Sequence, residues 1–355
     1  MEPTWHERTF TIDGERLHAI EQGEGPLVLM IHGFPGLAWS WRHQMAPLAA
    51  AGFRALAINS LGYGGSSRPA APEAYTAARM QDLLLGVLDA CGAASAYVIG
   101  QDFGAQYAWN LAVRSPERVA GLIATIPYDY DLAGRAMLGS APRLAPDAPT
   151  PPLSAGPDRL PTERFAAMGA EHFVHLDYFQ QVGAAEAELA ERVPEFLRRL
   201  FYALSSAGDL WSWKTVESAG HGYLDVLPEA PPLPWPWLSE AEFARFVAGY
   251  DHPDPALRFV GGLNSYRTAD ANWRDGLAFA DHDVSVPTLF VHGAADPSFG
   301  FFPDWEERLV RRVPGLRGIT AVAGAGHFVQ QEQPAAFNAA VIPFFTALRD
   351  APGHA

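Results

Sequence analysis

The stretch that decides the fold reads YVIGQDFGA over residues 97–105, an apolar strand that enters a turn of small residues and then a helix. Gly100 and Gly104 stand two residues before and two residues after Asp102. Glycine suits such flanks because the central residue sits in a strained turn, where neighbouring side chains would collide with the backbone. This frame is typical of a nucleophile elbow, with aspartate in the place that serine usually takes. We therefore predict that Asp102 presents its carboxylate at the tip of a sharp turn.

A simpler interpretation of Asp102 is that it caps the following helix, which is a frequent role of aspartate after a strand. As a nucleophile, aspartate would attack an sp³ carbon and form an alkyl ester on the enzyme, whereas attack on a carboxylic ester would give an anhydride. Epoxides and alkyl halides meet that requirement. The chain contains no G-x-S-x-G sequence, so an ordinary serine esterase is disfavoured.

Strands and helices alternate on both sides of this turn. Before the middle of the chain we expect a hairpin over 8–22, strands at 27–31, 53–58, 96–99 and 119–126, and helices near 38–51, 77–91 and 104–114. Near the end we expect a strand at 287–291, a helix near 303–312, a strand at 317–322 and a helix near 328–348. This alternation predicts an α/β fold with a mostly parallel central sheet and crossover helices.

Between the two halves the pattern changes. Residues 141–161 are rich in proline, and residues 228–239 read PEAPPLPWPWLS; neither stretch can pair inside a sheet. Helical stretches are expected near 163–206 and 239–277. We predict a helical cap (lid) domain over 128–280, inserted into a core made of 1–127 and 281–355, with a closed pocket beneath the cap.

Two further motifs follow Asp102 in the chain order of a catalytic triad. Asp296 stands in HGAADP over 292–297, and His327 stands in GAGHF over 324–328. We predict that His327 is the general base that activates water, and that Asp296 orients its ring. Taken singly, Asp296 could be a turn former and His327 a helix cap. Their occurrence in this order favours the catalytic interpretation.

A second signature, HGFP over 32–35, follows the first buried strand. The backbone amides of Phe34 and Phe103 can act as oxyanion-hole donors, and both side chains are candidates for substrate binding. A plain turn at HGFP is the alternative. The sequence leaves open whether the bond before Pro35 is cis or trans.

With these motifs in place, the chain resembles the soluble epoxide hydrolases of the α/β-hydrolase superfamily over nearly its whole length. The resemblance is carried by HGFP at 32–35, SWRHQM at 40–45, GYGGSSRP at 62–69, GQDFGA at 100–105, YFQ at 178–180, AEAELA at 185–190, LNSYR at 263–267 and GAGHF at 324–328. It implies an α/β-hydrolase core with an inserted cap. It also implies a two-step conversion of an epoxide to a vicinal diol through an ester on Asp102.

The resemblance further implies that two cap residues, usually tyrosines, hold the epoxide oxygen during ring opening. Tyr266 in LNSYR matches the second tyrosine, whereas His175 in FVHLDYFQ falls where the family has the first. A neutral imidazole N–H can polarise the oxygen, and an imidazolium can do so more strongly. We predict Tyr266 and His175 as the donors. The alternatives are a packed Tyr266, and a His175 on the cap surface with Tyr178 turned inward to bind substrate.

No metal or cofactor is expected. His172 and His175 have a spacing that metal ligands use, but no third ligand cluster is evident. Aromatic residues near the expected cap suit an apolar pocket, although those beside proline usually only pack. They include the tryptophans Trp211, Trp213, Trp235 and Trp237.

Two other functions compete with epoxide hydrolysis. A haloalkane or haloacid dehalogenase would use the same aspartate, but it needs donors for the departing halide. Phe34 and Phe103 stand where such donors would be expected, and no arginine follows Asp102 at the helix start. A catalytically silent ligand-binding protein of the same fold is the second alternative. The presence of Asp102, Asp296, His327 and Tyr266 argues against it.

Composition excludes some partners. The 355 residues include 40 acidic and 25 basic side chains, a formal charge of −15, which repels nucleic acid. Cys91 is the only cysteine, so no intramolecular disulfide can form. The N-terminal residues lack an apolar segment, and no run approaches about eighteen apolar residues; we expect a cytoplasmic protein without a membrane partner. Its expected partners are a small apolar epoxide and water. A homodimer and a role in detoxification are left open.

Overall fold

An eight-stranded sheet forms the centre of the computed structural model, which describes residues 5–128, 160–279, 282–301 and 305–351. Its strands are β1 His6–Ile12, β2 Glu15–Gln22, β3 Leu27–Ile31, β4 Arg54–Ile58, β5 Ala96–Gly100, β6 Val119–Ala124, β7 Thr288–Gly293 and β8 Leu316–Val322. They lie in the order β1-β2-β4-β3-β5-β6-β7-β8. β2 is antiparallel to β1 and β4, and from β4 onward neighbouring strands are parallel. The predicted α/β class is thus confirmed.

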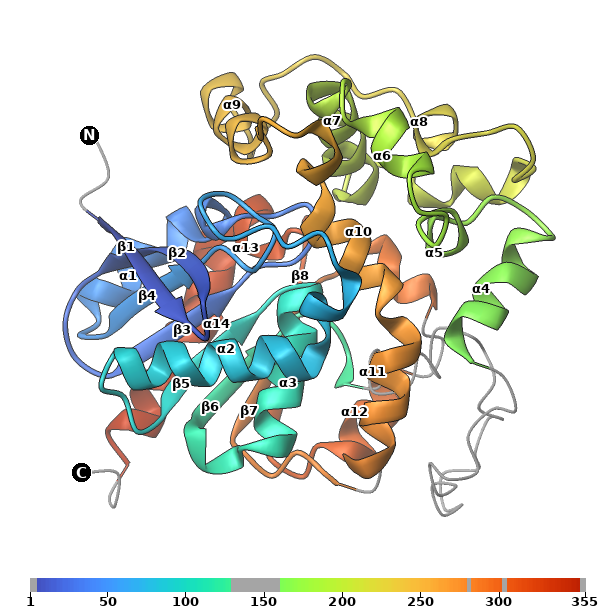
Figure 1. Ribbon diagram of the computed structural model, residues 1–355. Coiled ribbons are helices and arrows are strands. Elements are labelled where there is room, and N and C mark those ends of the chain that lie inside the picture. The colour runs from blue at the N-terminus through green and yellow to red at the C-terminus, as the bar shows by residue number, and fades with distance from the viewer. Residues whose placement is uncertain (1–4, 129–159, 280–281, 302–304, 352–355) are drawn as a thin grey trace.

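Helices cover both faces of this sheet (Figure 1). The core helices are α1 Arg42–Ala50, α2 Ala77–Ala90, α3 Phe103–Arg114, α12 Trp305–Arg312, α13 Val329–Glu332 and α14 Pro334–Arg349. Short 3₁₀ helices occur at Ala38–Trp41, Pro72–Tyr75, Pro116–Arg118, Leu210–Thr215, Pro255–Leu257, Leu277–Phe279 and Pro297–Phe301.

The inserted cap is helical. Its helices are α4 Pro161–Gly169, α5 His175–Tyr178, α6 Ala184–Leu189, α7 Val193–Leu204, α8 Tyr223–Val226, α9 Glu240–Gly249, α10 Val260–Arg267 and α11 Ala269–Gly276. Helices α5 to α9 gather over one end of the core in Figure 1. Most of the proline-rich stretch 141–161, and parts of both expected domain boundaries, lie outside the described residues. The division at 128 and 280 therefore stays a prediction.

The long helical stretches, including that near 239–277 with α9, α10 and α11, are more divided than the sequence pattern suggested. The expected helix near 328–348 is the pair α13 and α14, because Pro334 starts a new helix and its ring would disrupt a continuous one. The stretch near 163–206 contains four separate helices, α4 to α7. The apolar periodicity correctly indicated helices in these stretches. Periodicity alone does not show where one helix ends and the next begins.

Alternating side chains of β3 join two separate apolar clusters, because successive residues of a strand face opposite sides of the sheet. Leu29 and Ile31 belong to the cluster that contains α2 and α3. Val28 and Met30 belong to the cluster beneath α1 and α14. The first cluster continues into the cap, where it includes Phe196 of α7. The cap therefore packs on the core through continuous apolar contact.

No helix of the described residues is both long enough and apolar enough to cross a membrane.

Candidate active site

Asp102 occupies the turn between β5 and α3. Its backbone has φ 53° and ψ −124°, and among the described residues Asp13 is the other non-glycine residue with positive φ. A non-glycine residue in such a conformation is strained. The side chain accepts no hydrogen bond from the amides of α3. The interpretation of Asp102 as a helix cap is therefore wrong.

Glycines make room for this turn. A Cβ atom at Gly104 would lie 2.0 Å from the carbonyl oxygen of Ile31. A Cβ atom at Gly33 would lie 2.3 Å from Oδ1 of Asp102. Neither position has room for a side chain. Glycine at residues 33 and 104 therefore follows from the close contact between the end of β3 and the turn that carries Asp102.

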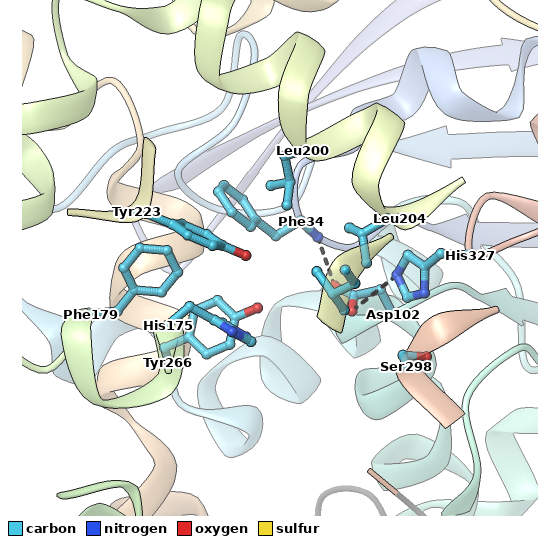
Figure 2. A pocket seen from close by; sticks show the side chains of 11 residues that line it. Phe34, Asp102, His175, Phe179, Leu200, Leu204, Tyr223, Tyr266, Ser298 and His327 are labelled. Atoms are coloured by element: carbon cyan, nitrogen blue, oxygen red, sulfur yellow. Dashed lines mark hydrogen bonds and ion pairs between the residues drawn. The ribbon is translucent and has the colours of Figure 1, made fainter. Parts of the chain in front are cut away.

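The carboxylate of Asp102 lies between two nitrogen donors (Figure 2). The backbone amide of Phe34 donates to Oδ1 at 2.8 Å, and the Phe34–Pro35 peptide bond is cis. Nε2 of His327 lies 3.4 Å from Oδ2. One carboxylate oxygen is thus held by the backbone, and the other faces the imidazole.

His327 and Asp296 form the second pair of the site. Nδ1 of His327 lies 3.1 Å from Oδ2 and 3.2 Å from Oδ1 of Asp296. Asp296 is itself fixed, because the backbone amide and the hydroxyl of Ser298 both donate to its Oδ1. His327 is 3% exposed, so its ring lies between two carboxylates with little solvent. The three residues that the sequence placed in order are brought together.

Electrostatics at this pair favour the imidazolium. Burial lowers the pKa of His327, but the charge of Asp296 and the contacts with Asp102 outweigh burial and raise the pKa to about 10. At neutral pH the ring is therefore protonated as long as both carboxylates are charged. Loss of either charge would lower this pKa.

Glu332 holds the loop that carries His327, and the sequence analysis did not find it. Its carboxylate accepts hydrogen bonds from the backbone amides of Gly326 and Phe328, on either side of His327, and from that of Ser206 in the cap. In addition, the amide of His327 donates to the carbonyl of Leu204 at 3.0 Å. The base is thus fixed by both core and cap. A glutamate five residues after the histidine was the available signal.

The pocket above Asp102 is lined by aromatic and aliphatic side chains with a few polar groups, as is usual for small-molecule sites. The lining residues are Phe34, Asp102, His175, Phe179, Leu200, Leu204, Leu210, Tyr223, Tyr266, Ser298 and His327. Of the predicted site residues, Phe103 does not line it. Phe103 is buried instead with its ring against Tyr266, at a centroid distance of 4.9 Å.

Tyr266 and His175 enter the pocket from two cap helices, α10 and α5. The edge of one ring meets the face of the other at 5.5 Å between centroids. In Figure 2 the hydroxyl of Tyr266 points toward the side of the pocket where Asp102 lies. Burial lowers the pKa of His175 to about 4, although the charge of Asp102 opposes this shift. The imidazole of His175 is therefore neutral at physiological pH.

Tyr178 does not reach the pocket, contrary to the expected role in substrate binding. Its hydroxyl donates to Oε2 of Glu188 at 2.7 Å, and its ring packs on Phe173. A hydrogen bond to a charged acceptor is stronger than one to a neutral group, which explains why the phenol turns toward α6. In this segment His175 and Phe179 line the pocket, and Tyr178 does not.

Tyr223 is a pocket residue that the sequence analysis missed. It begins the short helix α8, in a stretch without any of the motifs noted above. The tryptophans expected near the pocket do not line it: Trp235 and Trp237 contact each other, and Trp211 contacts Trp213. No cluster of three metal-ligating side chains occurs among the described residues, and the ring of His172 packs on Trp213.

Comparison with known proteins gives consistent results. The sequence matches the family described as "alpha/beta hydrolase fold" over residues 26–159. It is 37% identical to Epoxide hydrolase A of Mycobacterium tuberculosis, over 96% of this chain and 98% of that protein. The crystal structure of Epoxide Hydrolase A from Mycobacterium thermoresistibile matches with a TM-score of 0.80 and 38% identity, over 96% of this chain and 98% of that one. An epoxide hydrolase from an endophytic Streptomyces gives a TM-score of 0.84 at 32% identity, over 99% and 98% of the two chains.

Proposed function

This chain belongs to the epoxide hydrolases of the α/β-hydrolase superfamily, and from that membership we propose that it opens its epoxide in two steps through an ester on Asp102. As an epoxide hydrolase it adds water to an epoxide and releases a vicinal diol. The observation that carries the proposed mechanism is the position of the Asp102 carboxylate. It lies between the Phe34 amide and the His327 imidazole and faces an apolar pocket.

In the first step, Oδ2 of Asp102 attacks a carbon of the epoxide while Oδ1 stays hydrogen-bonded to the Phe34 amide. The carbon–oxygen bond of the ring breaks, and its electron pair goes to the epoxide oxygen. Tyr266 donates a hydrogen bond to that oxygen, with His175 as the second predicted donor. The oxygen takes up a proton from its donor, which is restored from solvent.

In the second step, water hydrolyses the ester. Esterification removes the charge of Asp102, and the pKa of His327, raised in the free enzyme by Asp296 and Asp102, then falls. The imidazolium can then release its proton and act as a base toward water. Water gives a proton to His327 and attacks Cγ of Asp102, and the amides of Phe34 and Phe103 stabilise the negative charge that develops on Oδ1. When the intermediate collapses, the bond between Cγ and Oδ2 breaks, Oδ2 leaves with the diol and takes the proton from His327, and the oxygen of water stays in the carboxylate. The base is thus generated at the stage that requires it.

The proposal is tested by trapping the ester. In His327→Gln the first step should proceed and the second should stall, since the base is missing. Mixing this variant with styrene oxide should give a protein whose mass increases by one substrate, and peptide mapping should place the addition on Asp102. The double variant with Asp102→Ala is the control and should remain unmodified.

Oxygen-18 water gives an independent measurement. In a single turnover of the unlabelled wild-type enzyme, the oxygen added to the diol should come from Asp102, and the label should appear in the carboxylate. A labelled diol in the first turnover would mean direct attack by water. That result, together with an absence of adduct in His327→Gln, would refute the ester mechanism.

A further inference from the structure

Tyr223 lines the pocket and is a largely buried residue whose hydroxyl belongs to the pocket wall. The residue is 2% exposed, and its hydroxyl forms no hydrogen bond within the described residues. In Figure 2 this hydroxyl points into the pocket, on the same side as that of Tyr266 and toward Asp102. A phenol hydroxyl that opens into a pocket beside a nucleophile can donate a hydrogen bond to a ligand bound there.

We propose that Tyr223 is a ring-opening donor that holds the epoxide oxygen together with Tyr266. This inference rests on the proposed ester mechanism and adds a residue to it. During attack by Asp102 the ring carbon–oxygen bond breaks, and both phenols donate hydrogen bonds to the oxygen that receives the electron pair. One phenol gives up its proton to this oxygen and recovers it from solvent.

The rings of Tyr223 and Tyr266 both pack against two other side chains, those of His175 and Phe179. The imidazole of His175 stacks on Tyr223, with 5.6 Å between centroids and 8° between planes, and meets Tyr266 edge to face at 5.5 Å. Phe179 contacts both phenol rings, at 5.4 Å and 5.1 Å. His175 therefore lies between the two phenols and fixes their spacing. In this arrangement Tyr223 takes the donor role that was predicted for His175, and His175 acts as a positioning residue.

The backbone at Tyr223 is held by Glu188 of α6. The carboxylate of Glu188 accepts from the amides of Tyr223 at 3.0 Å and of Leu224 at 2.8 Å. A Cβ atom at Gly222 would lie 2.3 Å from Oε1 of Glu188, so glycine at this position permits the approach. Glu188 also accepts from the Tyr178 hydroxyl. The segment that carries Tyr223 is thereby fixed relative to α5 and α6.

The protonation state of Tyr223 suits a donor. Burial, with a smaller effect of the Glu188 charge, raises the pKa of the Tyr223 phenol well above its usual range. The hydroxyl therefore keeps its proton in the free enzyme and can donate it to an oxygen that becomes strongly basic during ring opening.

The test is a comparison of three variants in single-turnover mixing with styrene oxide. Tyr223→Phe and Tyr266→Phe each remove one pocket hydroxyl. Tyr202→Phe removes a hydroxyl from α7, where the ring packs on Trp235 outside the pocket, and is the matched control. Rapid quenching measures the rate of ester formation on Asp102 and, separately, the rate of ester hydrolysis.

We expect Tyr223→Phe to slow ester formation by about tenfold to a hundredfold, since a general acid contributes roughly 10²–10⁴ and one donor remains. Ester hydrolysis should change less than about twofold, and Tyr202→Phe should leave both rates unchanged. An unchanged rate of ester formation in Tyr223→Phe would overturn the inference, as would an equal loss in both steps, which indicates a structural role. A different result would refute the proposed ester mechanism, namely that the wild-type enzyme itself forms no ester.

Discussion

Replacement of Asp102 by asparagine should lower the pKa of His327, because the ring would lose one of its two neighbouring charges. Nε2 of His327 lies 3.4 Å from Oδ2 of Asp102. Two unit charges at that separation interact by roughly 5 kcal/mol at an effective permittivity of about 20. Because each charge is spread over two atoms, about half of this value is realistic. A loss of roughly 2–3 kcal/mol corresponds to a pKa about two units lower.

The variant is a stable analogue of the charge state in the ester intermediate. Its side chain has nearly the shape of the carboxylate and is neutral, as the ester would be. The pKa of His327, raised to about 10 in the wild type by Asp296 and Asp102, should fall to roughly 8 in Asp102→Asn. The shift thus measures how strongly the first chemical step prepares the base for the second.

The assay is a proton–nitrogen NMR titration of protein labelled at its histidines, from pH 6 to pH 11. Intact mass should establish that residue 102 is still asparagine. His175 serves as an internal reference, because burial lowers its pKa to about 4 and it stays neutral over this range. Asp82→Asn, which removes an exposed charge of α2, is the control. A His327 pKa that differs by less than about half a unit between wild type and Asp102→Asn would refute the reasoning.

Two further predictions concern the parts that hold the site. Glu332→Gln replaces a carboxylate that accepts hydrogen bonds from three backbone amides, so at least one buried donor loses its partner. The free energy of unfolding should fall by about 1–3 kcal/mol, and ester hydrolysis should slow. Urea unfolding and quench experiments check both, and stability within about 0.5 kcal/mol of wild type would contradict the assigned contacts. Gly104→Ala should cost at least about 3 kcal/mol or prevent folding, because its Cβ would lie 2.0 Å from the Ile31 carbonyl oxygen. Calorimetry should show near wild-type stability for Gly318→Ala, whose Cβ would meet only the end of the Leu289 side chain at 3.3 Å.

The nucleophile elbow could be predicted from sequence because backbone geometry dictates its residues. Gly104 and Gly33 are required by close contacts at the elbow that a Cβ atom would destroy. Such requirements leave short, fixed patterns in the sequence. The same applies to the strands, whose apolar runs reflect burial on both faces of a parallel sheet. The order of Asp102, Asp296 and His327 then follows from the order of the strands that carry them.

The cap side of the pocket could be predicted only in part, because aromatic side chains that pack around a pocket leave no fixed pattern in the sequence. Tyr223 lies in a four-residue helix whose position depends on the carboxylate of Glu188, a contact between segments 35 residues apart. Tyr178 was a reasonable candidate for the pocket by its spacing, but its hydroxyl meets the same carboxylate. Which of several tyrosines faces a cavity depends on these tertiary hydrogen bonds, and the apolar periodicity of a helix does not report them.

The two steps of the proposed reaction depend on different parts of the fold, and this separates chemical roles from structural ones. Ring opening needs hydroxyl groups of the cap, whereas ester hydrolysis needs His327 and its partners at the core. The loop of His327 is nevertheless tied to the cap, through the Leu204 carbonyl and through Glu332, which also binds the Ser206 amide. A substitution that loosens the cap as a whole should therefore disturb the base and slow both steps. Loss of one phenol hydroxyl leaves those ties intact, so a selective loss of ring opening is the signature of a group that acts on the epoxide oxygen itself.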